Sequence, residues 1–409
     1  MDVLLEDGCV AAVGERLEAS AEIEILDASD LVVAPGFIDL HAHLREPGFE
    51  YKETIASGLR AAVAGGFTGV CCMPDTEPVN DDPAVTGFIR ERAEQVGLAR
   101  LYPIGAVSEG LKGEQLAEIG EMAEAGVVAI TDNHRPVVNA QLMRRALEYA
   151  RSFDLPVAAH EEDLDLADGG AMHEGAVSTR IGLRGMPSSA EEVMVARDVL
   201  LAELTGGRLH LCHLSTAIAL DLVRVARRRG LAVSCEVAAH QLILTDEDVA
   251  GANYDPNWKT NPPLRSAAEV EALLQAVYDG TVDAIVSDHE PHHLDDKELD
   301  FADAPFGIVG LETAVPLAVN RLVHGRVIGL MQFVRLMSTR PAEIFSLPGG
   351  SLREGAPADL TLLDLRALRT VDPESFASKS RNTPFAGMRL KGWPAATIVG
   401  GEIVWRRKH

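Results

Sequence analysis

The chain has 409 residues, of which 47% are hydrophobic, enough for one large domain beside a smaller one. Its formal net charge of -25 argues against a general nucleic-acid or anionic-membrane surface, because binding to phosphates requires clustered Lys and Arg. There is no Cys-x-x-Cys pair, no signal peptide and no apolar run long enough to span a membrane, so we expect a cytoplasmic protein with reduced thiols.

Short β-rich apolar runs recur from about residue 33 onward, and most of them are followed by a helical pattern. The predicted strands are 33–41, 67–73, 101–107, 127–132, 156–160, 208–214, 232–237 and 284–288. Helices are predicted between them, for example over 53–64, 139–153 and 217–229. Eight strands in a mostly regular βα alternation predict an α/β protein with a (β/α)8 TIM-like barrel. An open doubly wound sheet is the alternative, but no Gly-x-Gly-x-x-Gly follows the first strand to favour it.

The two ends of the chain differ from its middle, because they contain short strands and turns without long helices between them. We therefore expect residues 1–34 and 347–409 to form one small β-sandwich domain. Residues 35–346 would form the barrel.

The run from Asp39 to Gly48 begins as a hydrophobic strand and ends as a polar turn. Alternate residues of a strand point the same way, so His41 and His43 project side by side, with Arg45 just beyond them. Two imidazoles at this spacing can bind one divalent metal, and the guanidinium could hold a carboxylate close to it. An isolated His-x-His pair is a weak signal, so the rest of the chain decides.

In a barrel, the C-terminal ends of the strands converge on one mouth, and this chain places four histidines and two aspartates there. The candidate metal ligands are His41, His43, Asp132, His160, His213 and Asp288. This number of nitrogen and carboxylate donors predicts two metal ions, with Zn²⁺ favoured over manganese or cobalt. A hydroxide held between two ions could attack an amide-like carbonyl, and Asp288 would carry the proton to the leaving nitrogen.

These residues resemble the metal ligands of the amidohydrolase superfamily, and several phrases resemble the bacterial class I dihydroorotases. The phrases are His-Leu-Arg-Glu-Pro-Gly (43–48), Ala-Met-His-Glu-Gly (171–175), Asn-Pro-Pro-Leu-Arg (261–265) and Ala-Pro-Phe-Gly-Ile (304–308). The resemblance implies a zinc enzyme of pyrimidine biosynthesis that interconverts N-carbamoyl-L-aspartate and L-dihydroorotate. The family usually has a little more chain before the first strand, so the N-terminal part of the β domain is expected to be short.

The resemblance also implies the residues that bind the substrate. Arg45 matches the arginine that binds the substrate carboxylate, and His292 matches the histidine that assists it. Asn261 matches the asparagine that faces the pyrimidine ring. Phe306 and Gly307 match the backbone segment that covers the ring, and residues 294–304 would be the mobile loop that leads into this cover.

The chain departs from the family's phrases at several positions near the expected site, among them 75, 134 and 290. Asp75 stands in place of an asparagine that donates a hydrogen bond to the substrate carboxylate, whereas an ionised Asp only accepts. Two like charges ~4 Å apart at an effective dielectric near 20 repel by about 4 kcal/mol. Asp75 could be protonated, paired with Arg45 or turned away, or it could mark a changed substrate or a lost activity. Our hypothesis is that it weakens the binding of dihydroorotate. His134 and Glu290 stand in place of a glycine and an alanine, and His134 is either a loop residue or a contact of metal or substrate.

Two other functions remain open at this point. One is another cyclic amidase, of the dihydropyrimidinase, hydantoinase or allantoinase kind. The other is a non-catalytic dihydroorotase-like chain that supports an aspartate transcarbamoylase, although such a chain should lose metal ligands and this one keeps all six. A homodimer is expected by resemblance only.

Overall fold

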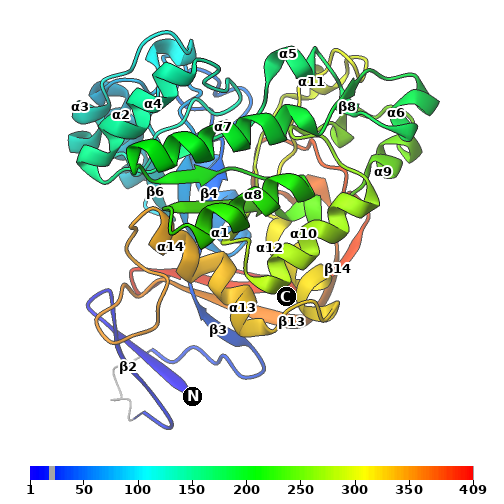
Figure 1. The fold of residues 1–409 in the computed structure, drawn as a ribbon. Coiled ribbons are helices and arrows are strands. Elements are labelled where there is room, and N and C mark those ends of the chain that lie inside the picture. The colour runs from blue at the N-terminus through cyan, green and yellow to red at the C-terminus, as the bar shows by residue number, and fades with distance from the viewer. Residues whose placement is uncertain (18–23, 409) are drawn as a thin grey trace.

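The structure is a computed structural model that describes residues 1–17 and 24–408, and Figure 1 shows a barrel surrounded by helices. Seven parallel strands line the barrel: β4 (Phe37–Ala42), β5 (Phe67–Cys72), β6 (Arg100–Pro103), β7 (Val157–Ala159), β10 (Leu209–Leu211), β11 (Val233–Ala238) and β12 (Ala284–Val286). They pair in the spatial orders β4-β5-β6 and β7-β10-β11-β12. A parallel bridge between Ala42 and His289 joins the last strand region to the first, which closes the predicted barrel.

The fourth barrel position is the weakest part of the prediction. Strand 127–132 is reduced to an extended segment in which Ile130 alone makes parallel bridges, to Gly105 on one side and Val157 on the other. The carboxylate of Asp132 accepts hydrogen bonds from backbone N–H groups of residues 107 and 108, each at 2.9 Å. The backbone ladder nevertheless continues through this segment, since Gly105 N donates to the carbonyl of Ala129 and Val107 N donates to that of Thr131, so the predicted fourth strand keeps its place in the barrel.

The predicted first strand, 33–41, is divided in the structure. Its beginning forms β3 (Val32–Pro35), which pairs antiparallel with β13 (Leu360–Thr370), and its end forms β4. Gly36 lies between the two, where a Cβ atom would approach Thr68 Oγ1 to 2.0 Å. A glycine is needed there, because the chain passes closely against the barrel as it leaves the terminal sheet.

Helices follow most of the barrel strands and cover the outside of the barrel (Figure 1). They are α1 (Ile55–Ala64), α2 (Pro83–Val96), α3 (Ile119–Ala125), α4 (Ala140–Ala150), α7 (Ser189–Thr205), α8 (Ala217–Arg228), α10 (Ala267–Asp279), α12 (Ala314–Ala318), α13 (Leu330–Val334) and α14 (Arg340–Ile344). The helices predicted over 53–64, 139–153 and 217–229 are confirmed as α1, α4 and α8. No described helix is long and apolar enough to cross a membrane.

Short elements gather at the end of the barrel away from β2 (Cys9–Gly14) and β3, as Figure 1 shows. They are α5 (Leu164–Ala167), β8 (Met172–His173), α6 (Ala176–Ile181), β9 (Gly185–Met186), α9 (Asp246–Gly251) and α11 (Leu294–Lys297). They belong to the loops that follow the barrel strands. These loops build the mouth in a barrel of this kind.

The two ends of the chain meet in a second β layer. A four-stranded sheet has the order β15-β14-β13-β3, where β14 spans Arg389–Val399 and β15 spans Glu402–Arg406. The hairpin of β1 (Asp2–Glu6) and β2 contributes Val3 and Leu5 to the same apolar cluster as Leu360 and Ile398. Strands from both termini therefore share one sandwich-like core beside the barrel.

Candidate functional site

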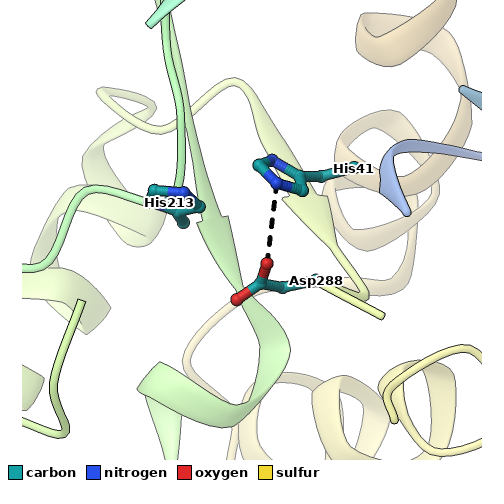
Figure 2. Close-up of side chains that lie close together, drawn as sticks. All are labelled: His41, His213 and Asp288. Carbon is teal, nitrogen blue, oxygen red and sulfur yellow. Dashed lines mark ion pairs between the residues drawn. The ribbon is translucent and has the colours of Figure 1, made fainter. Parts of the chain in front are cut away.

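The ends of three barrel strands bring His41, His213 and Asp288 together, as Figure 2 shows. Their ligand atoms all lie within 4.8 Å of one another, and His41 Nε2 is 3.7 Å from Asp288 Oδ1. All three residues are buried. His213 and Asp288 have positive φ angles of 34° and 50°, which are costly for residues with a Cβ atom and cluster at functional sites.

The protonation pattern of this cluster fits a divalent metal. His41 Nε2 and His213 Nδ1 are buried and have no hydrogen-bond partner among the described residues. Glu236 accepts a hydrogen bond from His41 Nδ1 at 3.0 Å, so Nε2 of His41 carries the lone pair. Leaving such nitrogens unsatisfied is costly, and a bound cation would satisfy them.

The other three predicted metal ligands lie beside this cluster and face different partners. His160 contacts it through a hydrogen bond of 3.1 Å between its Nδ1 and His213 Nε2. Asp132 is turned to the backbone of residues 107 and 108. The ring of His43 lies 5.8 Å from that of His41, centroid to centroid. The structure thus brings three of the six together, and the fourth touches them.

Burial and charge set the ionisation of the carboxyl groups at the site. Burial raises the pKa of Asp288 to about 6 and that of Asp132 to about 6 as well. Burial alone would also raise the pKa of Glu236, but hydrogen bonds from His210 and His41 lower it to about 2. Asp288 therefore loses its proton at a higher pH than an ordinary aspartic acid, whereas Glu236 stays ionised.

Arg45, at the end of the His-x-His segment, is held by two carboxylates. Its Nη1 donates to Asp75 Oδ2 at 2.6 Å, its Nη2 donates to Glu290 Oε1 at 3.1 Å, and its Nε donates to the carbonyl of Pro291 at 3.2 Å. Of the three expectations for Asp75, pairing with Arg45 is the one observed. Burial alone would raise the pKa of Asp75, but its contacts with His43 and Arg45 hold it well below its usual range.

His134 belongs to the same network. Its Nε2 is 3.2 Å from Glu290 Oε1, and its ring stacks on that of His43 at 4.8 Å and an interplanar angle of 6°. His134 therefore contacts a predicted metal ligand and an acid that pairs with Arg45. Three of the positions that depart from the family phrases, 75, 134 and 290, thus lie in one network around Arg45 and His43.

The residues expected around the substrate ring lie at the same mouth. Asn261 Nδ2 donates to Glu162 Oε2 at 2.9 Å and lies 3.4 Å from His160 Nε2. His292 Nε2 is 3.3 Å from Glu290 Oε1. Asn261 therefore lies beside His160, and His292 lies beside the Glu290 carboxylate that pairs with Arg45.

Phe306 and Gly307 lie in a segment that packs closely on this network. Gly307 has a φ of 108°, and a Cβ atom there would lie 2.1 Å from Glu290 Oε2. Lys259 Nζ lies 4.5 Å from the centre of the Phe306 ring. A glycine is thus required for the segment to approach Glu290.

Three residues that support the site were missed by the sequence reasoning. Glu236 orients His41, and a charged residue inside the apolar strand 233–238 was a signal that could have revealed it. Lys259 donates to the carbonyls of Ala302 and Ala304, both at 2.7 Å. Asn382 donates to the carbonyls of Glu290 and Gly307 at 2.9 and 3.1 Å. Asn382 comes from the C-terminal segment, where no motif marks it.

Comparison with known proteins decides the family. A dihydroorotase of Anaeromyxobacter dehalogenans (strain 2CP-C) is 54% identical over 402 residues, which cover 98% of this chain and 93% of that protein. The chain belongs to the dihydroorotase family. A dihydroorotase of Geobacter metallireducens is 50% identical over 407 residues, covering 100% of this chain and 95% of the relative. The family model described as Dihydro-orotase-like matches residues 30–218, and the one described as Amidohydrolase family matches residues 303–405.

Solved structures agree with the fold of this dihydroorotase. An L-hydantoinase (dihydropyrimidinase) from Arthrobacter aurescens has a TM-score of 0.89 and 26% identity, covering 100% of this chain and 92% of that one. A dihydropyrimidinase from Brevibacillus agri NCHU1002 has a TM-score of 0.84 at 24% identity, with the same coverage, and supports the fold alone. The resemblance seen in the sequence is confirmed: this is an enzyme of pyrimidine biosynthesis that hydrolyses a cyclic amide.

Proposed function

We propose that this dihydroorotase interconverts N-carbamoyl-L-aspartate and L-dihydroorotate with two Zn²⁺ ions per chain and with Asp288 as the proton carrier. The observation that carries the proposal is the buried cluster of His41, His213 and Asp288, in which two imidazole nitrogens lack a partner among the described residues. The proposed metal ligands are these three with His43, Asp132 and His160. When bound, the metal would polarise the amide carbonyl and lower the pKa of the attacking water.

Asp288 is suited to move the proton in both directions. With a pKa of about 6 it is largely ionised at neutral pH, so it can accept a proton from the attacking water. It then gives this proton to the ring nitrogen as the carbon–nitrogen bond breaks. In ring closure the Asp288 carboxylate takes a proton from the attacking nitrogen and gives it to the departing hydroxide, which leaves as water.

The residues that the resemblance implies for the substrate would surround a ring bound beside this cluster. Arg45 would bind the carboxylate, Asn261 and His292 would contact the ring, and Phe306 with Gly307 would cover it. Asp75, Glu290 and the carbonyl of Pro291 already accept hydrogen bonds from Arg45. A substrate carboxylate must therefore share these donors or displace the present acceptors. We therefore expect dihydroorotate to bind more weakly than Arg45 alone would allow.

The test is a substrate panel with the zinc-loaded protein. Dihydroorotate, dihydrouracil, hydantoin and allantoin are assayed side by side, and the metal content is measured in the same samples. The proposal expects about two zinc ions per chain and the highest kcat/KM for dihydroorotate. Absence of bound zinc under replete conditions contradicts both metal and mechanism, and would favour a non-catalytic chain that supports an aspartate transcarbamoylase.

A second candidate activity is hydrolysis of a cyclic amide without a carboxylate, of the hydantoinase or dihydropyrimidinase kind. The observation in its favour is that Asp75 and Glu290 already neutralise Arg45. The same panel separates the two, since this candidate requires dihydrouracil or hydantoin to be the better substrate.

The proposal also covers the domain boundaries, the cellular compartment and the oligomeric state. Residues 1–34 with 347–409 form the β domain and 35–346 the barrel, and the protein acts in the cytoplasm as a homodimer. Residues 18–23 and 409 of this β domain lie outside the described residues. Light scattering with and without an added aspartate transcarbamoylase measures the oligomeric state and tests for association between the two enzymes.

A further inference from the structure

Three loops place Asp75, His134 and Arg45 around the buried imidazole of His43. Asp75 Oδ1 lies 2.7 Å from His43 Nδ1, and Asp75 Oδ2 accepts from Arg45. His134 stacks on the ring. We propose that Asp75 is a positioning residue for His43, fixing the tautomer and orientation that leave Nε2 of this imidazole free to bind the metal. The inference rests on the proposed role of His43 as a ligand.

The chemistry of a carboxylate makes this assignment specific. An ionised carboxylate can only accept a hydrogen bond, so His43 Nδ1 must carry the proton and Nε2 the lone pair. His43 Nε2 lies 3.4 Å from Asn133 Nδ2, a donor, which agrees with a lone pair on that nitrogen. An amide at position 75 could donate or accept, and would leave the tautomer undetermined.

The neighbouring ligand is held in the same way. His41 Nδ1 lies 3.0 Å from Glu236 Oε1. His41 Nε2 faces the cluster with His213 and Asp288 and has no hydrogen-bond partner among the described residues. Each histidine of the His-x-His segment thus has a carboxylate on Nδ1. Such outer carboxylates orient a metal-bound imidazole and raise its basicity as a ligand.

The remaining contacts make Asp75 rigid enough for this role. One carboxylate oxygen faces His43 and the other faces Arg45, so rotation of the group would break both contacts. Arg45 is itself fixed by Glu290 and by the carbonyl of Pro291. The stacked ring of His134 restricts the plane of His43.

A metal ion shared by His43, Asp75 and His134 is the competing interpretation, because their ligand atoms lie within 4.8 Å of one another. The geometry argues against it. The two stacked rings are nearly parallel, so one ion cannot lie in the plane of both. The Arg45 guanidinium, 2.6 Å from Asp75 Oδ2, would also repel a cation there.

The test measures Zn²⁺ binding, with no substrate present. Metal-free wild type, Asp75→Asn and Glu77→Gln are titrated with Zn²⁺ against a competing chelator. Glu77 is an exposed acid of the same loop whose side chain makes no hydrogen bond among the described residues, so Glu77→Gln is the matched control. We expect the affinity of one site to fall about 10- to 100-fold in Asp75→Asn and to stay unchanged in Glu77→Gln. Equal affinities for wild type and Asp75→Asn would overturn the proposal.

A second measurement needs no Asp75 variant. Nitrogen NMR of ¹⁵N-histidine-labelled, metal-free wild type reports the tautomer of each imidazole, and the signal of His43 is assigned by its loss in His43→Gln. A proton on Nδ1 supports the proposal, and a proton on Nε2 overturns it.

The two proposals fail separately. If the zinc-loaded wild type does not act on dihydroorotate while Asp75→Asn still loses zinc affinity, the proposed substrate is wrong and the role of Asp75 stands. If dihydroorotate is turned over and zinc affinity does not depend on residue 75, the role of Asp75 is wrong and the substrate stands.

Discussion

Glu290 lies beside Arg45, the residue proposed to bind the substrate carboxylate. Glu290 pairs with Arg45 Nη2 and lies against the segment that carries Gly307, so its charge faces the place proposed for the substrate carboxylate. Replacing Glu290 with Ala should lower the KM for dihydroorotate by at least about tenfold, because a repulsion of more than 1.4 kcal/mol is removed. Zinc affinity should stay unchanged. A KM equal to that of wild type would show that Glu290 moves away when substrate binds.

The same reasoning applies to Asp75, with one difference. Asp75→Asn should also raise kcat/KM for dihydroorotate, but only when zinc is kept saturating, since Asp75 is proposed to support a metal ligand. Steady-state kinetics at high and low free zinc check this. No improvement at saturating zinc would contradict the idea that Asp75 weakens substrate binding.

Asp288 should control the rate more than the binding of substrate. Asp288→Asn keeps the size of the side chain but cannot carry a proton, so kcat should fall about 100- to 10,000-fold with a small change in KM. Metal content is measured in the same preparation, because Asp288 is also a proposed ligand. A fully metal-loaded variant with a kcat close to that of wild type would remove Asp288 from the mechanism.

Among single residues, the sequence predicts those that lie at the end of a barrel strand. It misses those whose contacts are with residues far away along the chain. His41, His213 and Asp288 could be placed because parallel strands deliver their C-terminal residues to one mouth. Asn382 could not, since its contacts with Glu290 span 92 positions and depend on how the C-terminal segment folds back. No local periodicity carries that information.

The loop predicted to be mobile, 294–304, is held at both ends by lysines. Lys259 donates to the carbonyls of Ala302 and Ala304, and Lys297 donates to those of Pro256 and Pro305. Lys259→Met should therefore loosen the loop, raise KM about tenfold and speed cleavage within it by a protease. Lys112→Met, at an exposed lysine, is the control. Equal cleavage rates in the two variants would show that the loop does not depend on Lys259.

Helices and strands could be predicted where the apolar periodicity and the capping residues agree. They were harder to predict where contacts with the rest of the fold determine how regular an element is. Helix α1 begins after Thr54 with a reciprocal capping pair to Ser57, close to its predicted start. The segment 127–132 has the composition of a strand and keeps backbone hydrogen bonds to both neighbouring strands, but within it only Ile130 forms parallel bridges. How regular a strand becomes depends on its neighbours in the sheet, which a single sequence does not show.

Across the whole molecule, the composition of the two ends of the chain predicts that they form one β domain. It does not predict that the C-terminal segment returns to the mouth of the barrel. Glu312, in the loop after the last barrel strand, accepts hydrogen bonds from the backbone N–H groups of Ala377 and Ser378 at 2.8 and 3.2 Å. Glu53 accepts another from Lys379 N at 3.2 Å. The buried Glu53 and the half-buried Glu312 therefore anchor the C-terminal segment that carries Asn382.

This anchoring should make stability depend on pH. Burial raises the pKa of Glu312 from 4.5 to about 7, so the folded protein keeps a proton that the unfolded chain loses between these values. The free energy of unfolding should thus fall as pH rises from about 4.5 to about 7, by roughly 3 kcal/mol from this group. Glu312→Gln keeps the acceptor oxygen without the charge, and should remove this part of the slope. Denaturant unfolding of the metal-free protein across that range measures it, with Glu354→Gln, at an exposed acid, as the control. Identical pH slopes for wild type and Glu312→Gln would show that Glu312 is ionised in the fold at pH values well below 7.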